Sequence, residues 1–193
     1  MFVSLEGLDG VGKTTQAAHL AARLRAEGHE VVECREPGGT VLGERLRDVL
    51  LHDREVGVGA RAEALLFAAA RAQLVEEVVA PARARGAWVV CDRFLDSSVA
   101  FQGGARGLGL ETVRELSVFA GGGLVPDRTV LLVGDRRGLL VPDRIEREGD
   151  AFHARVAEAF EVIAAREPER VRTVDGSGSV ESVGARVRAA LDG

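Results

Sequence analysis

Gly7-Leu8-Asp9-Gly10-Val11-Gly12-Lys13-Thr14 matches the pattern G-x-x-x-x-G-K-[S/T], which is typical of a phosphate-binding loop. The glycines allow backbone N–H groups to turn inward around phosphate oxygens. The Lys13 ammonium group can reach the β- and γ-phosphates, and the Thr14 hydroxyl can bind Mg²⁺. Residues 7–14 therefore predict a nucleoside triphosphate site in which Thr14 is the metal-binding residue.

The loop lies in the context that this motif requires, with a strand before it and a helix after it. Residues 1–5 are apolar and β-prone. After the loop, Leu20 and Leu24 lie four residues apart on one helical face, and Gly28 is a helix stop signal. The positive N-terminal end of this helix would face the phosphates. A glycine-rich turn that carries a lysine by chance is a much weaker explanation of this arrangement.

Length and composition are typical of one soluble globular domain over residues 1–193. The chain has 193 residues, of which 46% are hydrophobic and 28% are charged. The net charge of −5 and the scattered basic residues argue against nucleic-acid binding. We find no signal peptide and no apolar run that could span a bilayer, so we expect a cytoplasmic protein. Cys34 and Cys91 lack metal-type spacing and are predicted to be buried free thiols.

Strand and helix patterns alternate along the chain, which predicts an α/β fold with a five-stranded parallel sheet and helices on both faces. The predicted strands cover residues 1–5, 30–34, 87–91, 129–133 and 171–174. The predicted helices cover residues 14–27, 43–51, 60–85, 97–104, 110–120, 150–167 and 180–192. We expect a bend near Pro81 in the longest helix and an N-cap at Asp96.

Polar residues follow the first three predicted strands. Asp9 and Lys13 follow the first strand, residues 35–39 follow the second, and Asp92 and Arg93 follow the third. Because ligands bind at the carboxyl ends of the strands in such sheets, we expect these segments to share a site. Asp92 could hold the water shell of Mg²⁺, and Arg93 could clamp a phosphate of a second substrate. The alternative is a surface ion pair after a strand, which this position disfavours.

Two further pairs are spaced four residues apart, so each pair shares a helical face. Phe67 and Arg71 could stack on a nucleobase and bind its edge. Taken alone, this pair is more typical of a core ring beside an arginine that reaches water. Ser98 and Gln102 would offer polar groups to one side. Additional positive charge near the second strand comes from Arg35 and Arg47. Either of these arginines could instead be a solvated surface residue.

Taken together, these segments resemble bacterial thymidylate kinases. The matching segments are residues 6–14, 35–40, 66–71, 92–94, 96–103, 126–129 and 143–146. They occur in order and cover nearly the whole chain. Many families share the phosphate-binding loop, whereas Arg35-Glu36-Pro37-Gly38-Gly39 and Asp96-Ser97-Ser98 are much more specific. The resemblance implies a P-loop NTPase fold of the nucleoside monophosphate kinase type, with a short lid at about residues 134–150.

The resemblance also implies a homodimeric enzyme that transfers the γ-phosphoryl group of ATP to dTMP with Mg²⁺, giving dTDP and ADP in dTTP biosynthesis. The loop over residues 7–14 would hold ATP. The residues implied in catalysis are Lys13, Asp92, Arg93 and Arg144. The residues implied in dTMP binding are Asp9, Arg35, Glu36, Arg47, Phe67, Arg71, Arg93, Ser98, Phe101 and Gln102.

Specific tasks follow from the same resemblance. Phe67 would stack on thymine, while Arg71 and Gln102 would hydrogen-bond the edge of the base. Arg35 and Arg93 would hold the phosphate of dTMP. The acceptor is already an anion, so phosphoryl transfer would need positioning and charge stabilisation rather than a strong general base.

The chain departs from the family at two places. The family usually has Tyr where this chain has Phe101, which would fill the space of a ribose 2′-hydroxyl; Asp9 would contact the 3′-hydroxyl region. The lid is also shorter than usual. Family members whose phosphate loop lacks an arginine, as here, supply one from the lid. Arg144 matches that arginine best, and the other candidates are Arg136, Arg137 and Arg147.

Two alternatives remain on the residues alone. The same fold could use another acceptor, either a different nucleoside monophosphate or a deoxynucleoside. The chain could also be a nucleotide-dependent switch or a slow ATPase. Phe67, Arg71 and Gln102 favour a base pocket, and therefore a kinase over a switch. A switch GTPase would also be expected to carry an Asn-Lys-x-Asp segment, which this sequence lacks.

Overall fold

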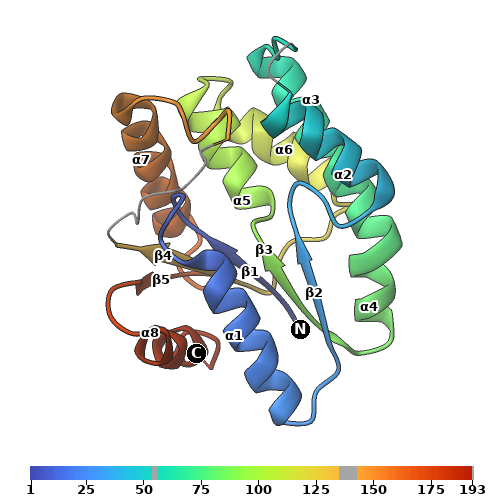
Figure 1. Ribbon diagram of the computed structural model, residues 1–193, viewed down its shortest axis with the longest axis vertical. Helices are drawn as coiled ribbons and strands as arrows, with labels where there is room; N and C mark the ends of the chain where they lie inside the picture. The colour runs from blue at the N-terminus through green and yellow to red at the C-terminus, as the bar shows by residue number, and fades with distance from the viewer. Residues whose placement is uncertain (54–55, 135–142, 193) are drawn as a thin grey trace.

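A computed structural model describes residues 1–53, 56–134 and 143–192 of the chain (Figure 1). In this part of the chain, five parallel strands form one sheet in the order β2-β3-β1-β4-β5. The strands are β1 (Phe2–Glu6), β2 (Val31–Arg35), β3 (Trp88–Asp92), β4 (Arg128–Val133) and β5 (Val171–Asp175). The predicted five-stranded parallel sheet is therefore confirmed.

Helices connect successive strands. The described α-helices are α1 (Lys13–Ala26), α2 (Val41–Arg47), α3 (Ala60–Leu74), α4 (Ala80–Ala84), α5 (Leu95–Ser98), α6 (Leu110–Ala120), α7 (Asp150–Arg166) and α8 (Val180–Ala189). Three π-helical segments extend them, namely η1 (Asp48–His52), η2 (Val75–Val79) and η3 (Val99–Ala105). The helix predicted over residues 60–85 is thus three segments, and the wide turn η2 ends two residues before Pro81. Proline cannot donate a hydrogen bond to the carbonyl one turn earlier, so regular α-helix is interrupted there.

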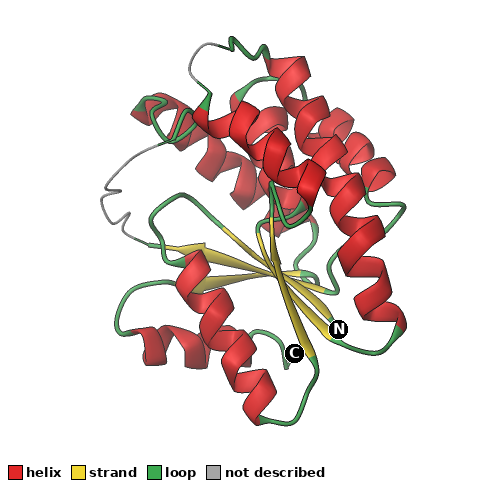
Figure 2. Ribbon diagram, turned by 45° about the vertical axis from the view of Figure 1, so that its right-hand side comes forward, coloured by secondary structure: helices red, strands yellow, loops and turns green. Residues whose placement is uncertain are grey.

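One apolar layer covers each face of the sheet. α1 and α8 lie together on one face (Figures 1 and 2), where Leu24 and Val187 pack in one cluster with Val3. α3, α4 and α7 lie on the opposite face over a larger cluster that includes Phe2. Phe2 and Val3 enter different clusters because neighbouring strand residues point to opposite faces. Burial on both faces explains why these strands are continuous apolar runs.

Both cysteines are free thiols. Cys91 on β3 is buried, as predicted, but Cys34 on β2 is only half-buried. The prediction for Cys34 is wrong because β2 is an edge strand of the sheet, with a neighbour on one side only. Within the described ranges, no helix has both the length and the apolar character needed to cross a membrane.

The phosphate loop and the carboxyl ends of β2 and β3 meet at one end of the sheet, where the parallel strands terminate. β1 and β2 both pair with β3, and Arg35 at the end of β2 lies beside Asp92. Gly7 opens the loop with a φ of 132°, and a Cβ there would lie 2.3 Å from the Leu132 carbonyl oxygen. Only glycine allows the backbone to pass so close to β4.

Asp96 is not the predicted N-cap. It lies inside α5, whose N-cap position is Phe94 and has no side-chain hydrogen bond. The Asp96 side chain is 2% exposed and accepts hydrogen bonds of 2.7 Å from Arg170 Nη1 and Nη2 and of 2.9 Å from Thr129 Oγ1. These partners lie far away in the sequence, so the local pattern gave no sign of them.

Replacing Asp96 by alanine should lower the free energy of unfolding by about 3 kcal/mol, because it removes the buried carboxylate that pairs with Arg170 Nη1 and Nη2, although Glu167 still accepts from Arg170 Nε over 2.7 Å. Urea denaturation measures this change. Glu169→Ala is the matched control, since Glu169 pairs with Arg172 at 3.2 Å and its side chain is 91% exposed. The control should change the stability by less than about 1 kcal/mol. Equal losses in the two variants would contradict the buried pair.

Candidate active site

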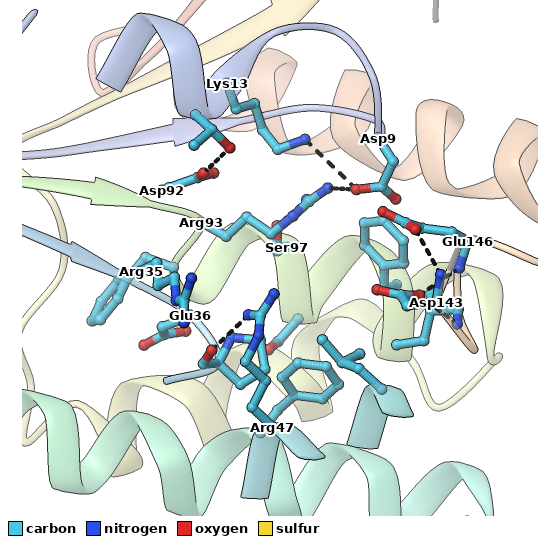
Figure 3. A pocket seen from close by; sticks show the side chains of 18 of the residues that line it. Asp9, Lys13, Arg35, Glu36, Arg47, Asp92, Arg93, Ser97, Asp143 and Glu146 are labelled. Carbon is cyan, nitrogen blue, oxygen red and sulfur yellow. Dashed lines mark hydrogen bonds and ion pairs between the residues drawn. The ribbon is translucent and has the colours of Figure 1, made fainter. Parts of the chain in front are cut away.

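A cavity of about 420 Å³ opens at this end of the sheet (Figure 3). It brings together most of the predicted site residues from elements that are distant in sequence. The predicted residues that line it are Asp9, Gly10, Gly12, Lys13, Thr14, Arg35, Glu36, Arg47, Phe67, Arg71, Asp92, Arg93, Ser98, Phe101 and Gln102. The predicted residues, all described, that do not line it are Gly7, Leu8, Val11 and Arg144.

The phosphate loop and Asp92, at the end of β3, build one half of the cavity. Thr14 Oγ1 donates a hydrogen bond of 2.5 Å to Asp92 Oδ2, and Lys13 Nζ donates one of 2.7 Å to the Leu8 carbonyl oxygen. A hydroxyl and a carboxylate are oxygen ligands of the kind that Mg²⁺ prefers. Thr14 and Asp92 therefore fit a magnesium ion beside the phosphates.

Lys13 has an unusual electrostatic environment. Its side chain is 6% exposed, and Nζ lies 3.8 Å from Asp9 Oδ1. Burial, together with the positive charge of Arg93, lowers the pKa of Lys13 to about 8, although Asp9 and Asp92 oppose this change. Lys13 is also the single lysine of the chain. As the pH rises through about 8, the amine loses its proton and with it the charge that attracts phosphates.

Amine acylation should report on Lys13 directly. We expect its acylation by acetic anhydride, followed by mass spectrometry, to rise with a midpoint near pH 8 rather than 10.5, because only the neutral amine reacts. ATP should protect Lys13, since phosphates favour the charged form. The N-terminal amine of Met1 is the internal reference. A midpoint near 10.5 would show that the amine is not desolvated.

Arg93 lies between the phosphate loop and the rest of the cavity. Its φ of 69° is in the left-handed region, and its N–H donates to the Leu5 carbonyl oxygen over 3.0 Å. Nη1 donates to the Gly7 carbonyl oxygen over 3.0 Å and to Ser97 Oγ over 2.8 Å, while Nη2 pairs with the Asp9 carboxylate. Strained backbone of this kind persists where the surroundings hold it, and it concentrates at functional sites.

The sequence-based assignment missed two residues that hold Arg93 in place. Glu6 is fully buried and accepts hydrogen bonds of 2.7 Å from the Phe94 N–H and 2.5 Å from the Ser97 hydroxyl. Burial, and then the nearby charge of Asp96, raises the pKa of Glu6 to about 8. Their place in the sequence could have marked them as site residues, because Glu6 and Ser97 both lie in segments that resemble the thymidylate kinase family.

Arg71 dominates the other half of the cavity. It is 1% exposed, so the interpretation in which it reaches water is wrong. Nε donates to Glu36 Oε2 over 3.0 Å, and Nη2 donates to Glu36 Oε2 over 2.5 Å and to Ser98 Oγ over 2.9 Å. Nη1 is buried and has no hydrogen-bond partner among the described residues. A buried donor without a partner is costly, so a ligand that accepts from it would be stabilised.

Aromatic rings and an amide form the walls around Arg71. Phe67 comes from α3, one turn before Arg71, and is partly buried. Phe101 and Gln102 come from η3 and are 6% and 1% exposed. The guanidinium of Arg93 lies 5.2 Å from the centre of the Phe101 ring. Two flat apolar faces and a few polar groups are suited to a planar heterocycle.

Two further arginines bring positive charge to the cavity from β2 and α2 (Figure 3). Arg35 Nη2 pairs with Glu44 Oε2 at 3.1 Å, and the Arg35 side chain is 54% exposed. Arg47 Nη1 donates to the Pro37 carbonyl oxygen over 2.8 Å. Arg47 is half-buried, whereas Arg35 is exposed and has room to turn toward an anion.

Asp143 and Glu146 also line the cavity and were not predicted, although the segment over residues 143–146 was noted (Figure 3). Asp143 Oδ1 accepts hydrogen bonds of 2.8 Å from the N–H groups of Ile145 and Glu146, and Glu146 Oε2 accepts one of 2.8 Å from the Asp143 N–H. Burial raises the pKa of Glu146. These carboxylates give the cavity an acidic wall opposite its arginines.

Arg144 itself is turned away from the cavity. Its Nε donates to the Leu50 carbonyl oxygen and its Nη2 to Glu63 Oε2, over 2.8 Å and 2.7 Å. The other lid candidates Arg136 and Arg137, with residues 135–142 of the predicted lid, lie outside the described residues. The catalytic role of Arg144 stays a prediction, because Arg144 would have to leave Glu63 to reach a phosphate.

The sheet order, the loop that opens α1 and the shared cavity define a P-loop phosphotransferase of the nucleoside monophosphate kinase type. The family model for thymidylate kinase matches residues 5–187. The chain therefore belongs to the thymidylate kinase family.

Individual relatives agree with this assignment. The chain is 52% identical to a thymidylate kinase of Rhizorhabdus wittichii, over 98% of this chain and 96% of that protein. It is 50% identical to one of Bifidobacterium longum, over 97% of this chain and 95% of that protein. Among solved structures, thymidylate kinase from Ehrlichia chaffeensis superposes with a TM-score of 0.83 and 30% identity, covering 100% of this chain and 98% of that one.

Proposed function

We propose that this chain transfers the γ-phosphoryl group of ATP to dTMP, giving dTDP and ADP for dTTP synthesis. The observation that carries the proposal is Arg71 Nη1, a buried donor with no partner in the described structure, in a cavity that also holds the phosphate loop. The O4 atom of thymine would accept from it. Membership of the thymidylate kinase family supports the same pair of substrates.

The phosphate donor would lie on the loop over residues 7–14. Backbone N–H groups and the N-terminal end of α1 would hold the phosphates of ATP, and Lys13 would contact the β- and γ-phosphates. Thr14 and Asp92 would hold Mg²⁺, which supplies positive charge to the phosphates when it is bound. The charged form of Lys13 is needed for this contact, so ATP binding should weaken above about pH 8.

The acceptor would occupy the half of the cavity that Arg71 dominates. Phe67 would stack on the thymine ring, while Arg71 and Gln102 would bind its edge. The phosphate of dTMP would lie between Arg93 and Arg35, with further positive charge from Arg47, which places it toward the loop that holds ATP.

The deoxyribose would lie beside Phe101, near Asp9. The Phe101 ring would leave no room for a ribose 2′-hydroxyl, and the Asp9 carboxylate would accept from the 3′-hydroxyl. Asp143 and Glu146 extend this acidic wall. Because the Phe101 ring has no hydroxyl, its own contact with the sugar would depend on shape alone.

Transfer would depend on charge and position. The acceptor oxygen is already anionic, so no general base is required, but two polyanions must be held together against their repulsion. Lys13 and Arg93 would offset the negative charge of the transferring group. Arg144 would add to this from the lid after leaving Glu63.

We further propose a single domain over residues 1–193 with a lid at about residues 134–150. A homodimer located in the cytoplasm is proposed by family resemblance. Size-exclusion chromatography with light scattering tests the dimer.

The function is tested by an enzyme-linked ADP-release assay with dTMP, dUMP, dCMP, AMP and thymidine as acceptors. We expect dTMP to give the highest kcat/KM. If dTMP gave no acceleration over water while another acceptor did, the proposed reaction would be wrong. If ADP release were slow with every acceptor, the chain would be an ATPase or a switch instead.

A further inference from the structure

Glu63 lies on the same face of α3 as Phe67 and Arg71, which belong to the proposed dTMP site. It precedes Phe67 by four residues and Arg71 by eight, so the three side chains follow one stripe along the helix. Unlike Phe67, Glu63 is polar, and its side chain is 0% exposed. A buried carboxylate is costly unless it is well paired, so its partners indicate why it is there.

Four hydrogen bonds from three side chains meet at this carboxylate. Gln102 Nε2 donates to Oε1 over 2.9 Å, and Arg144 Nη2 donates to Oε2 over 2.7 Å. Arg106 donates to both oxygens over 3.2 Å. Burial by itself would raise the pKa of Glu63, but the hydrogen bonds from Arg106, Gln102 and Arg144 lower it below its ordinary value. Glu63 is therefore an ionised, acceptor-only group.

This charge state fixes the orientation of the Gln102 amide. An amide has a donor end, the NH₂ group, and an acceptor end, the carbonyl oxygen. Only the donor end can face a carboxylate, so Nε2 is held at Glu63 and Oε1 is the end left for the cavity that Gln102 lines. Arg71 lines the same cavity, and its Nη1 is a donor without a partner among the described residues.

We propose that Glu63 is a positioning residue that sets base specificity, by holding the Gln102 amide so that the pocket accepts thymine or uracil and rejects cytosine. Thymine and uracil present an acceptor at O4 and a donor at N3–H. Cytosine presents a donor at N4 and an acceptor at N3, which is the reverse pattern. With Glu63 ionised, Gln102 cannot turn over to suit cytosine. This inference rests on the proposed function.

Glu63→Gln tests the proposal in the full-length chain. The new amide can accept or donate, so Gln102 becomes free to turn over. We expect the ratio of kcat/KM for dTMP to that for dCMP to fall at least about tenfold, which corresponds to roughly 1.4 kcal/mol. The ratio of dTMP to dUMP should not change, because these two bases present the same edge to Gln102.

Glu148→Gln is the matched control. Glu148 Oε1 accepts from Arg106 Nη1 over 2.5 Å, so this variant makes the same chemical change at the same arginine without contacting Gln102. We expect wild-type ratios from it. If it reproduced the effect of Glu63→Gln, the effect would come through Arg106 and the proposal would be wrong. An equal loss for dTMP, dUMP and dCMP in Glu63→Gln would also overturn it.

A second variant keeps the proposal testable if Glu63→Gln does not fold. Gln102→Leu retains Glu63 and removes the oriented amide, so it should lower the dTMP to dCMP ratio by a similar factor. Where both variants fold, the double variant should fall no further than either single one. A wild-type ratio in Gln102→Leu would overturn the proposal. Wild-type protein that cannot use dTMP would instead overturn the proposed function.

Discussion

Replacing Lys13 by methionine should lower kcat by about 10²–10³-fold, the scale expected when one preorganised charge contact to a reacting group is lost. Lys13 is the single lysine of the chain, and its ammonium group is aimed along the phosphate loop at the Leu8 carbonyl oxygen. No other side chain of the loop carries a positive charge. Steady-state ADP release with dTMP measures the effect, and a fall of less than about tenfold would remove Lys13 from the transferring phosphate.

The same variant should not destabilise the protein. The pKa of Lys13 is lowered from 10.5 to about 8, which means that folding opposes its charge. That penalty is fully present below about pH 8 and fades as the pH rises toward 10.5, so wild-type stability should increase across this interval. Methionine has no such charge, so the increase should be absent. Urea denaturation at several pH values measures both curves, and a wild-type curve without this increase would contradict the lowered pKa.

Replacing Arg93 by lysine should lower kcat by about 10³-fold, although the positive charge is kept. The guanidinium contacts the Gly7 carbonyl oxygen, Ser97 Oγ and the Asp9 carboxylate with two different nitrogens. A lysine ammonium is a single point of charge and cannot keep this fork while also clamping a phosphate. Loss of position rather than loss of charge is therefore the expected cause.

Arg85→Lys is the matched control for Arg93→Lys. Arg85 pairs with Glu30 at 2.6 Å, and both side chains are about half exposed, at 48% and 57%. The control should retain the wild-type kcat. If Arg93→Lys also retained kcat within about tenfold, the fork geometry would have no role in transfer.

Local sequence patterns were sufficient to predict the architecture and the phosphate loop. The helix predicted over residues 110–120 coincides with α6, and α1 begins at Lys13, one residue before the predicted start. Apolar runs such as β3 identified strands buried on both faces. These features depend on contacts between near neighbours in the sequence, and the residue types themselves reveal them.

Local sequence patterns could not predict the polar pairs inside the core. Asp96 is typical of an N-cap by its local position, yet it binds Arg170, 74 residues later. Arg71 by spacing alone could reach water, yet Glu36, 35 residues earlier, holds it in the core. Arg144 matches a lid arginine, yet Glu63, 81 residues earlier, holds it away from the cavity. A side chain's partner across such a separation depends on how the elements pack.

The sequence of the loop over residues 7–14 was sufficient to establish a triphosphate site, because one short segment supplies both the backbone turns and the side chains for it. Only the tertiary structure established which hydrogen-bonding atoms of Arg71 and Gln102, in the proposed dTMP site, remain for a ligand. Among the described residues, Arg71 Nη1 has no partner because Glu36 and Ser98 bind the other nitrogens, and Gln102 keeps its oxygen because Glu63 binds its NH₂ group. A hydrogen-bonding group has a limited number of donors and acceptors, so its specificity depends on those that the fold has not already used.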